Sequence, residues 1–174
     1  MKLRLLEAST QLPVSVADIK EYVRQDSDRD DHLLSGLIQT ATTWVEEATS
    51  KTLLKKKWLY QNKNTLLRLP RGPIIDVEEV KVGHKTLSKK DYRVIDQGGS
   101  AKIEMPFSWH QKTVSITYTA GFGEKVEDIP ETLRHAIKST VAYIYDNRYS
   151  LPTSKTHAFH NMQPWIHYHR TAMI

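Results

Sequence analysis

The stretch HLLSGLIQTATTWVEEAT, residues 32–49, carries the clearest periodic pattern in the chain. Its apolar residues recur at intervals of three and four, the spacing that places side chains on one face of an α-helix. The face comprises Leu33, Leu34, Leu37, Ile38, Ala41, Trp44, Val45 and Ala48. The pattern predicts a helix over about residues 28–49 whose apolar stripe packs against the rest of the protein.

Two shorter patterns predict further helices. Ser15 precedes Asp18 by three residues, a spacing typical of a helix start with a side-chain cap, and it predicts a helix over about residues 15–24. Later in the chain, Pro130 stands among acidic residues, and both features are favourable in a first helical turn. Apolar residues at helical spacing follow it, which predicts a helix over about residues 130–147.

Between these helices the apolar residues change to the alternation of β-strands. TVSITYT, residues 113–119, is typical of a half-buried strand. Shorter apolar segments precede it and are divided by turn signals such as PRGP, residues 70–73. We expect an antiparallel sheet of about five or six short strands over about residues 57–119. The predicted fold class is α+β, a small helical bundle with an inserted antiparallel β-sheet and an extended C-terminal tail.

The length of 174 residues suits one domain, because a chain of this size buries about 70% of its unfolded surface without disulfides or a structural metal. We expect one domain over residues 1–150 and a tail over residues 151–174. The tail holds three aromatic residues, more than a disordered linker needs. Trp165, Tyr168 and Arg170 are the candidate partner-binding residues, because aromatic residues and arginine carry much of the energy of protein interfaces.

The composition excludes several classes of protein. The chain has no cysteine, which excludes a disulfide scaffold, a thiolate zinc site and a cysteine nucleophile, and which suits a reducing cytoplasm. No apolar run approaches the roughly 18 residues of a membrane span, and the apolar stretch at the N-terminus is too short for a signal peptide. We therefore expect a soluble protein, made inside the cell, with no membrane partner.

Charge is divided unevenly along the chain. The sequence holds 25 Lys plus Arg and 20 Asp plus Glu, a net charge of +5. Residues 16–50 hold three basic and eight acidic residues, whereas residues 51–112 hold fourteen basic and six acidic ones. The positive excess can indicate nucleic-acid binding, but opposite charge in two segments also suits contacts between copies of one protein, or ordinary solvated surfaces. The sequence leaves these alternatives open.

Histidines in the tail form the one cluster that suggests metal binding: His157, His160, His167 and His169. The first two are three residues apart and would share a helical face. However, no acidic residue follows Asp146 to complete a ligand set, and Pro164 interrupts any helix. We interpret these histidines as exposed or partner-facing. The turn GFG, residues 121–123, lacks the nucleophile of a hydrolase. We expect no catalytic residue, no cofactor-binding residue, no metal site and no enzymatic activity.

Two charged segments have both a functional and a structural interpretation. The lysines of residues 55–57, followed by Trp58 and Tyr60, could bind phosphates and stack bases. A strand that buries the aromatic residues and leaves the lysines solvated explains the same pattern, and we favour it. The acidic run over residues 26–31 lacks the glycine and the final glutamate of an EF-hand loop, so we interpret it as a helix start.

The order of these motifs resembles the head-to-tail connector proteins, also called adaptor or head-completion proteins, of long-tailed double-stranded DNA phages and of gene transfer agents. The resemblance covers about residues 12–150. It rests on LPVSVADIK (12–20), the helix that closes with TSKTL (49–53), LPRGPI (69–74), YTAGFG (118–123) before Ile129-Pro130, and YDNR (145–148). Each motif is mostly turn and cap chemistry, and their order and spacing together make the resemblance specific.

The resemblance implies a non-enzymatic structural virion protein, assembled in the host cytoplasm and located in the neck between the capsid portal and the tail. Family members form a ring, usually dodecameric, beneath the portal, and they extend the DNA exit channel. The implied partners are other copies of the chain, the portal protein through the C-terminal segment, and stopper or tail proteins. Packaged DNA would pass through the lumen without sequence-specific binding.

The charge of the sheet predicts one property of the channel, and two alternative functions remain open. Each firm Lys or Arg contact would retain DNA in a channel, so we expect that the lysine-rich sheet does not line the lumen as an uninterrupted positive belt. The first rival is another ring component of the neck or tail, such as a stopper or a tail terminator. The second rival is a DNA-binding accessory protein.

Overall fold

The computed structural model describes residues 1–63, 67–106, 112–147, 166 and 169. The described chain divides into two compact units. The β unit comprises Met1–Thr10 and Ser50–Glu124, and the helical unit comprises Gln11–Thr49 and the described residues of Lys125–Arg170. None of the described helices combines the length and the hydropathy needed to cross a membrane.

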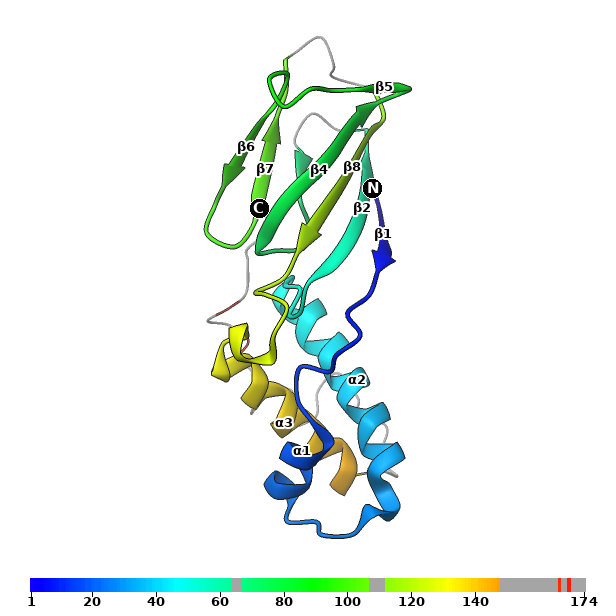
Figure 1. Ribbon diagram of the computed structural model, residues 1–174, viewed down its shortest axis with the longest axis vertical. Helices are drawn as coiled ribbons and strands as arrows, with labels where there is room; N and C mark the ends of the chain where they lie inside the picture. Colours follow the sequence, from blue (N-terminus) through cyan, green and yellow to red (C-terminus); the bar gives the residue numbers. More distant parts are fainter. Residues whose placement is uncertain (64–66, 107–111, 148–165, 167–168, 170–174) are drawn as a thin grey trace. The chain divides into compact units, whose positions relative to one another are not determined.

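The helical unit contains the three predicted helices (Figure 1). They are α1 (Val16–Val23), α2 (Asp31–Thr49) and α3 (Glu131–Asp146), with short 3-10 helices at η1 (Asp28–Asp30) and η3 (Val126–Asp128). The predicted cap is confirmed, because the Asp18 backbone N–H donates to Ser15 Oγ and the Ser15 N–H donates to the Asp18 carboxylate. The acidic run before α2 forms η1 and starts the helix, as interpreted from the sequence.

The core of the helical unit is built from one stripe of each helix. The fully buried side chains include Ile19 in α1, Leu34 and Ile38 in α2, and Leu133 and Ile137 in α3. A part of the predicted α2 stripe is not covered. Leu33 is 39% exposed, and Leu37, Trp44 and Ala48 are only partly buried. The helical period predicts the apolar face of α2, but the part of this face that is buried in the subunit is narrower than the predicted stripe.

The β unit contains two antiparallel sheets. The first has the order β1-β2-β8-β4-β5, and its strands are Lys2–Glu7, Lys56–Asn62, Val114–Ala120, Ile74–Val82 and Lys85–Thr86. The second has the order β3-β7-β6, with strands Leu67–Arg68, Ala101–Glu104 and Arg93–Asp96. The α+β class is confirmed. Two details of the prediction are wrong, since one sheet was expected and since its first strand, β1, lies before the predicted range of 57–119.

The pairing of strands explains both corrections. β1 pairs with β2 at the edge of the first sheet, and all but one of its residues are exposed, so no buried face marked it in the sequence. Both sheets contribute to a single apolar core: Tyr60, Leu67, Leu69, Val77, Val80, Val82, Leu87, Ala101, Ile103, Val114, Ile116, Tyr118 and Ala120. The central strand β8 is the most buried of the described strands. Its first residues alternate between buried and half-buried, as expected from the sequence, but Tyr118, Thr119 and Ala120 are buried in succession, so the strand is more buried than the expected half-buried one.

Candidate functional site

The tail residues proposed for partner binding, Trp165, Tyr168 and Arg170, lie outside the described residues, and their role stays a prediction. The same holds for three of the four tail histidines. The fourth, His169, has its Nε2 atom 2.6 Å from the Thr132 hydroxyl of α3. Across the part of the chain that the structure describes, no three His, Cys, Asp or Glu side chains gather where they could hold a metal ion.

The lysines and aromatic residues of β2 support the structural interpretation of that segment. Tyr60 is 2% exposed, so its ring is no stacking platform. Trp58 is partly buried against the same core, its indole N–H donates to the Thr52 hydroxyl at 3.1 Å, and the Arg71 guanidinium lies 5.8 Å from its ring centroid. Lys57 Nζ lies 2.6 Å from the Glu78 carboxylate. This contact raises the pKa of Lys57, and together with the Thr119 hydroxyl it lowers the pKa of Glu78.

Lys55 forms a second such pair, with its Nζ atom 2.6 Å from Glu124, and the contact raises the pKa of the lysine. In the first sheet, Lys81 adds a third pair with Glu79 at 2.7 Å. Carboxylates of the same unit therefore neutralise part of the positive charge of the sheet. A lysine paired with a carboxylate offers less net positive charge to a phosphate, so this arrangement weakens the nucleic-acid interpretation of the lysine-rich segment.

Two of the motifs that carried the resemblance meet in the β unit. The Gly72 carbonyl oxygen accepts a hydrogen bond from the Thr52 N–H at 2.7 Å, which joins PRGP to the segment that follows α2. Gly72 also lies against Gly99 so closely that a Cβ atom would be 2.0 Å from the Gly99 carbonyl oxygen. Only glycine fits there, which gives the physical reason for the glycine of this motif.

A buried lysine completes this contact. Lys51 is 6% exposed, and its Nζ atom donates to the Gly99 carbonyl oxygen at 2.9 Å. Burial lowers the pKa of Lys51, although the nearby Asp96 carboxylate opposes the shift. The ammonium group thus holds the turn between β6 and β7 against the chain after α2. The sequence offered no signal for this role, because the contact joins residues 48 positions apart.

The third motif, YTAGFG, joins the same region. Gly121 has a φ of +144°, and a Cβ atom there would lie 2.7 Å from the Lys55 nitrogen. Its N–H donates to the Pro73 carbonyl at 2.9 Å, and the Lys55 N–H donates to the Gly123 carbonyl at 2.8 Å. The motifs at residues 49–53, 69–74 and 118–123 therefore meet at one junction of backbone hydrogen bonds. Each motif was identified in the sequence, but the contact between them was not predicted.

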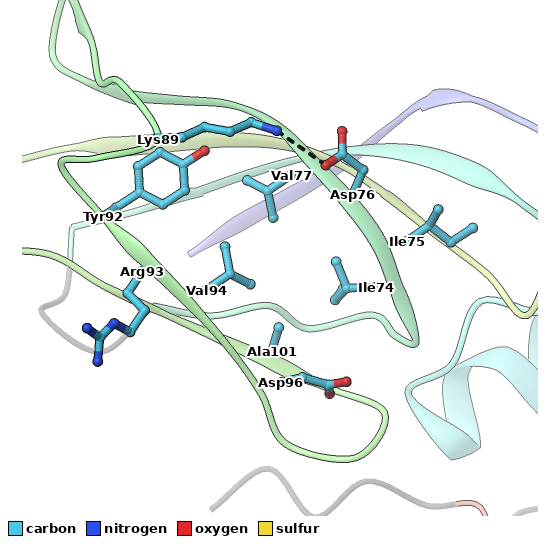
Figure 2. Close-up of a pocket in the computed structure, with 10 residues that line it drawn as sticks. All are labelled: Ile74, Ile75, Asp76, Val77, Lys89, Tyr92, Arg93, Val94, Asp96 and Ala101. Carbon is cyan, nitrogen blue, oxygen red and sulfur yellow. Dashed lines mark ion pairs between the residues drawn. The ribbon is translucent and has the colours of Figure 1, made fainter.

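A groove of about 390 Å³ lies between β4 and the second sheet (Figure 2). Val77, Val94 and Ala101 form part of its apolar lining, and Val94 is 42% exposed. At its edge Lys89 and Asp76 form a loose ion pair at 3.8 Å. The residues that line this groove include no histidine, serine or cysteine. The arrangement suits contact with another surface, and it offers no nucleophile paired with a base.

The helical unit carries its own exposed surface on α2. Residues 32–45 contain no Asp, Glu, Lys or Arg, although much of this stretch is solvent-exposed. Over the described residues, the helical unit has twelve acidic and six basic side chains, whereas the β unit has sixteen basic and eight acidic ones. The segmental charge difference read from the sequence therefore separates the two units.

Comparison with known proteins finds similar folds among solved structures. The chain is similar in fold to a structure described as the neck of an empty gene transfer agent (GTA) particle computed with C6 symmetry, at 19% identity and a TM-score of 0.81. It is also similar to chains of the virion of a native GTA particle (19%, 0.80) and of the neck of a native GTA particle computed with C12 symmetry (20%, 0.76). Each similarity covers 100% of this chain and 97% of the other. Among curated proteins none matches.

A family model described as head completion protein matches residues 13–160, which is most of the chain. The matched range includes every residue of the motifs on which the resemblance was based except Leu12, and it confirms that resemblance. The chain belongs to the head completion protein family.

Proposed function

We propose that this protein is a non-enzymatic structural component of a virion neck, which forms a cyclic ring beneath the portal and extends the DNA exit channel toward the tail. The observation that carries the proposal is the match of the head completion family over residues 13–160. The fold similarity to neck chains of particles treated with C6 and C12 symmetry supports a ring, and the C12 case favours a dodecamer.

The charge distribution supports the ring on physical grounds. In a cyclic ring each subunit presents one face to the next subunit and a different face to the previous one. A chain whose described helical unit is acidic and whose β unit is basic carries both halves of such a contact. The ion pairs of Lys55 and Lys57 agree with a channel protein that does not retain DNA.

The ring is tested by deleting the gene from a phage or particle that encodes it and by imaging the products. Heads that package DNA but lose it, or that fail to join tails, are the expected result. Normal infectious particles would contradict the proposal. Cryo-electron microscopy of wild-type particles decides between a ring directly beneath the portal and a more distal ring, which would be a stopper or a tail terminator.

A DNA-binding accessory protein is the competing function, and a salt titration separates it. Duplex DNA is mixed with the purified protein at low salt and then at rising salt. We expect weak binding at every salt concentration, because carboxylates of the same unit already accompany several sheet lysines. Tight binding that falls steeply with salt would favour the accessory function.

We propose that the C-terminal tail contacts the portal through Trp165, Tyr168 and Arg170. Truncation after residue 150 is a poor test, because Ile166 is 9% exposed and His169 contacts α3, so the truncated chain would lose packing as well. The triple substitution of the three residues by alanine keeps both contacts. We expect it to abolish binding to isolated portal rings while the thermal unfolding midpoint stays within a few degrees of wild type. Retained portal binding would refute the role of the tail.

A further inference from the structure

One face of α2 is exposed to varying degrees along its length. We define the α2 seam as Leu33, Gly36, Leu37, Thr40 and Trp44, which share one face of the helix because they recur at intervals of three and four. Leu33 is 39% exposed, Gly36 and Thr40 are exposed, and Leu37 and Trp44 are partly exposed. We propose that the α2 seam is a contact surface between neighbouring copies of this chain, and this proposal rests on the ring proposed above.

The composition of the seam is that of an interface centre. Residues 32–45 include no Asp, Glu, Lys or Arg in a chain of which 26% is charged. An exposed helix face that only meets water normally carries charged side chains. The cores of protein interfaces are depleted of charge and are enriched in large apolar and aromatic residues. Leu33, Leu37 and Trp44 supply such residues on α2.

Gly36 supplies an independent argument. It lies inside α2, where glycine is less favourable than alanine because of its backbone freedom. A Cβ atom at this position would meet nothing within 4 Å, so the fold of the subunit does not require glycine there. A neighbouring chain that approaches the helix backbone closely does require it. One turn later, Thr40 adds a short side chain whose hydroxyl donates a hydrogen bond to the Gly36 carbonyl oxygen at 3.0 Å.

The charges favour a second copy as the occupant. Acidic residues lie at both ends of the uncharged stretch, Asp31 before it and Glu47 after it, and the helical unit as described has twelve acidic and six basic side chains. The complementary surface is basic, and the same chain provides one in its β unit, with sixteen basic and eight acidic residues. Packaged DNA is disfavoured as the occupant, because exposed leucine next to acidic residues gains nothing from phosphates.

A pair of adjacent substitutions tests the seam. Thr40→Lys places a charge in the seam, whereas Gln39→Lys places the same charge on a neighbouring exposed position outside it. Ring formation by the purified full-length protein is measured by native mass spectrometry and negative-stain microscopy over a concentration series, with incorporation into particles as a second readout. We expect Thr40→Lys to weaken assembly at least about tenfold and Gln39→Lys less than about twofold.

Gly36→Ala gives a second test whose two readouts move in opposite directions. Alanine raises helix propensity, so the unfolding midpoint of the unassembled subunit should rise by about 2–4 °C. The added methyl group should hinder close approach of the neighbour and reduce ring formation. A variant that is less stable and less assembled would show only a folding defect, and one that assembles as well as wild type would overturn the role of Gly36.

The outcomes separate this inference from the proposed ring. If the wild-type protein forms no ring, alone or on particles, the proposed function fails. If wild type and Thr40→Lys form rings equally well, the ring stands and the seam proposal is overturned. If Thr40→Lys forms normal rings that slow DNA release, the seam faces the lumen, which also overturns the proposal. Selective loss of rings in Thr40→Lys and Gly36→Ala supports it.

Discussion

Gly72 and Gly121 of the β unit and Gly36 of the helical unit lie in opposite surroundings. A Cβ atom on Gly72 would lie 2.0 Å from the Gly99 oxygen and one on Gly121 would lie 2.7 Å from the Lys55 nitrogen, whereas one on Gly36 would meet nothing within 4 Å. The β unit therefore needs Gly72 and Gly121 for its own backbone contacts. The helical unit does not need Gly36 for its fold. The motifs at residues 69–74 and 118–123 thus owe these glycines to contacts inside the β unit, whereas the packing of the subunit gives no reason for Gly36.

Gly72→Ala is expected to have the largest effect, because the new methyl group collides with backbone that cannot move away without breaking the junction. We expect a loss of about 4 kcal/mol or more in the free energy of unfolding. Urea titration followed by circular dichroism measures it. Gly98→Ala is the matched control, since Gly98 has a φ of +68° but open space around it, and it should cost only about 1 kcal/mol. Equal losses would show that the close contact is not what requires glycine at residue 72.

The next largest effect compares two neighbouring leucines of α2. Leu34 is fully buried, and Leu34→Ala should cost about 3 kcal/mol through lost burial and the cavity it leaves. Leu33 is 39% exposed, so Leu33→Ala should cost less than about 1 kcal/mol in the isolated subunit. Thermal and urea unfolding of both variants under conditions that keep the protein monomeric measure the difference. Similar costs would mean that Leu33 belongs to the core and that the seam is not open.

The helices were more predictable from the sequence than the sheets. The sequence predicted three helices within about three residues of their ends, because helix caps and apolar period are local signals. It missed β1, whose residues are mostly exposed, and it merged two sheets into one, because turn signals show where strands end and not which strands pair. The period also placed Leu33 in the packed stripe, since it cannot tell how far neighbouring helices cover an apolar face.

The junction of the three motifs was less predictable, because local signals do not show which segments come into contact. The motifs at residues 49–53, 69–74 and 118–123 were found in order, yet their convergence depends on contacts between Thr52 and Gly72 and between Gly121 and Pro73. Long-range contacts of this kind have no local pattern. The buried position of Lys51 was equally hidden, because a lysine is almost always exposed unless it has a partner.

Lys51→Met tests whether the β unit depends on its buried cation. The Gly99 carbonyl loses its donor, so we expect a loss of about 1–2 kcal/mol at pH 7. The pKa of Lys51 is lowered from its ordinary 10.5, so between the two values the unfolded chain binds more protons, and wild-type stability gains with rising pH. The difference between wild type and Lys51→Met should therefore widen in urea titrations as the pH rises through the lowered pKa of Lys51 toward 10.5. A difference that narrows over this range would show that the hydrogen bond, and not burial, dominates the pKa.

Glu78→Gln is expected to change the free energy of unfolding least among these main variants. It tests whether the ion pairs of the β unit stabilise that unit. Glu78 is held by Lys57 Nζ and by the Thr119 hydroxyl, each at 2.6 Å, and its pKa is lowered from the ordinary 4.5. Its stabilising contribution is therefore present above pH 4.5 and is lost as the pH falls through the lowered pKa. With a side chain 33% exposed, solvent screening limits the cost of the substitution to about 1 kcal/mol at pH 7.

The control for this prediction is the adjacent Glu79→Gln, which removes an ion pair with Lys81 between two more exposed side chains and should cost less than about 0.5 kcal/mol at pH 7. Unfolding measured in a series of falling pH from pH 7 decides the comparison, because the gap between wild type and Glu78→Gln should close as the pH falls through the lowered pKa of Glu78. If the gap stays constant over the whole range in which wild type remains folded, the carboxylate charge is not its cause, and Lys57 would then be a cation available to a partner. If it closes, the β unit uses the charge of Lys57 for its own stability, and the basic surface offered to a neighbouring copy must come from its other cations.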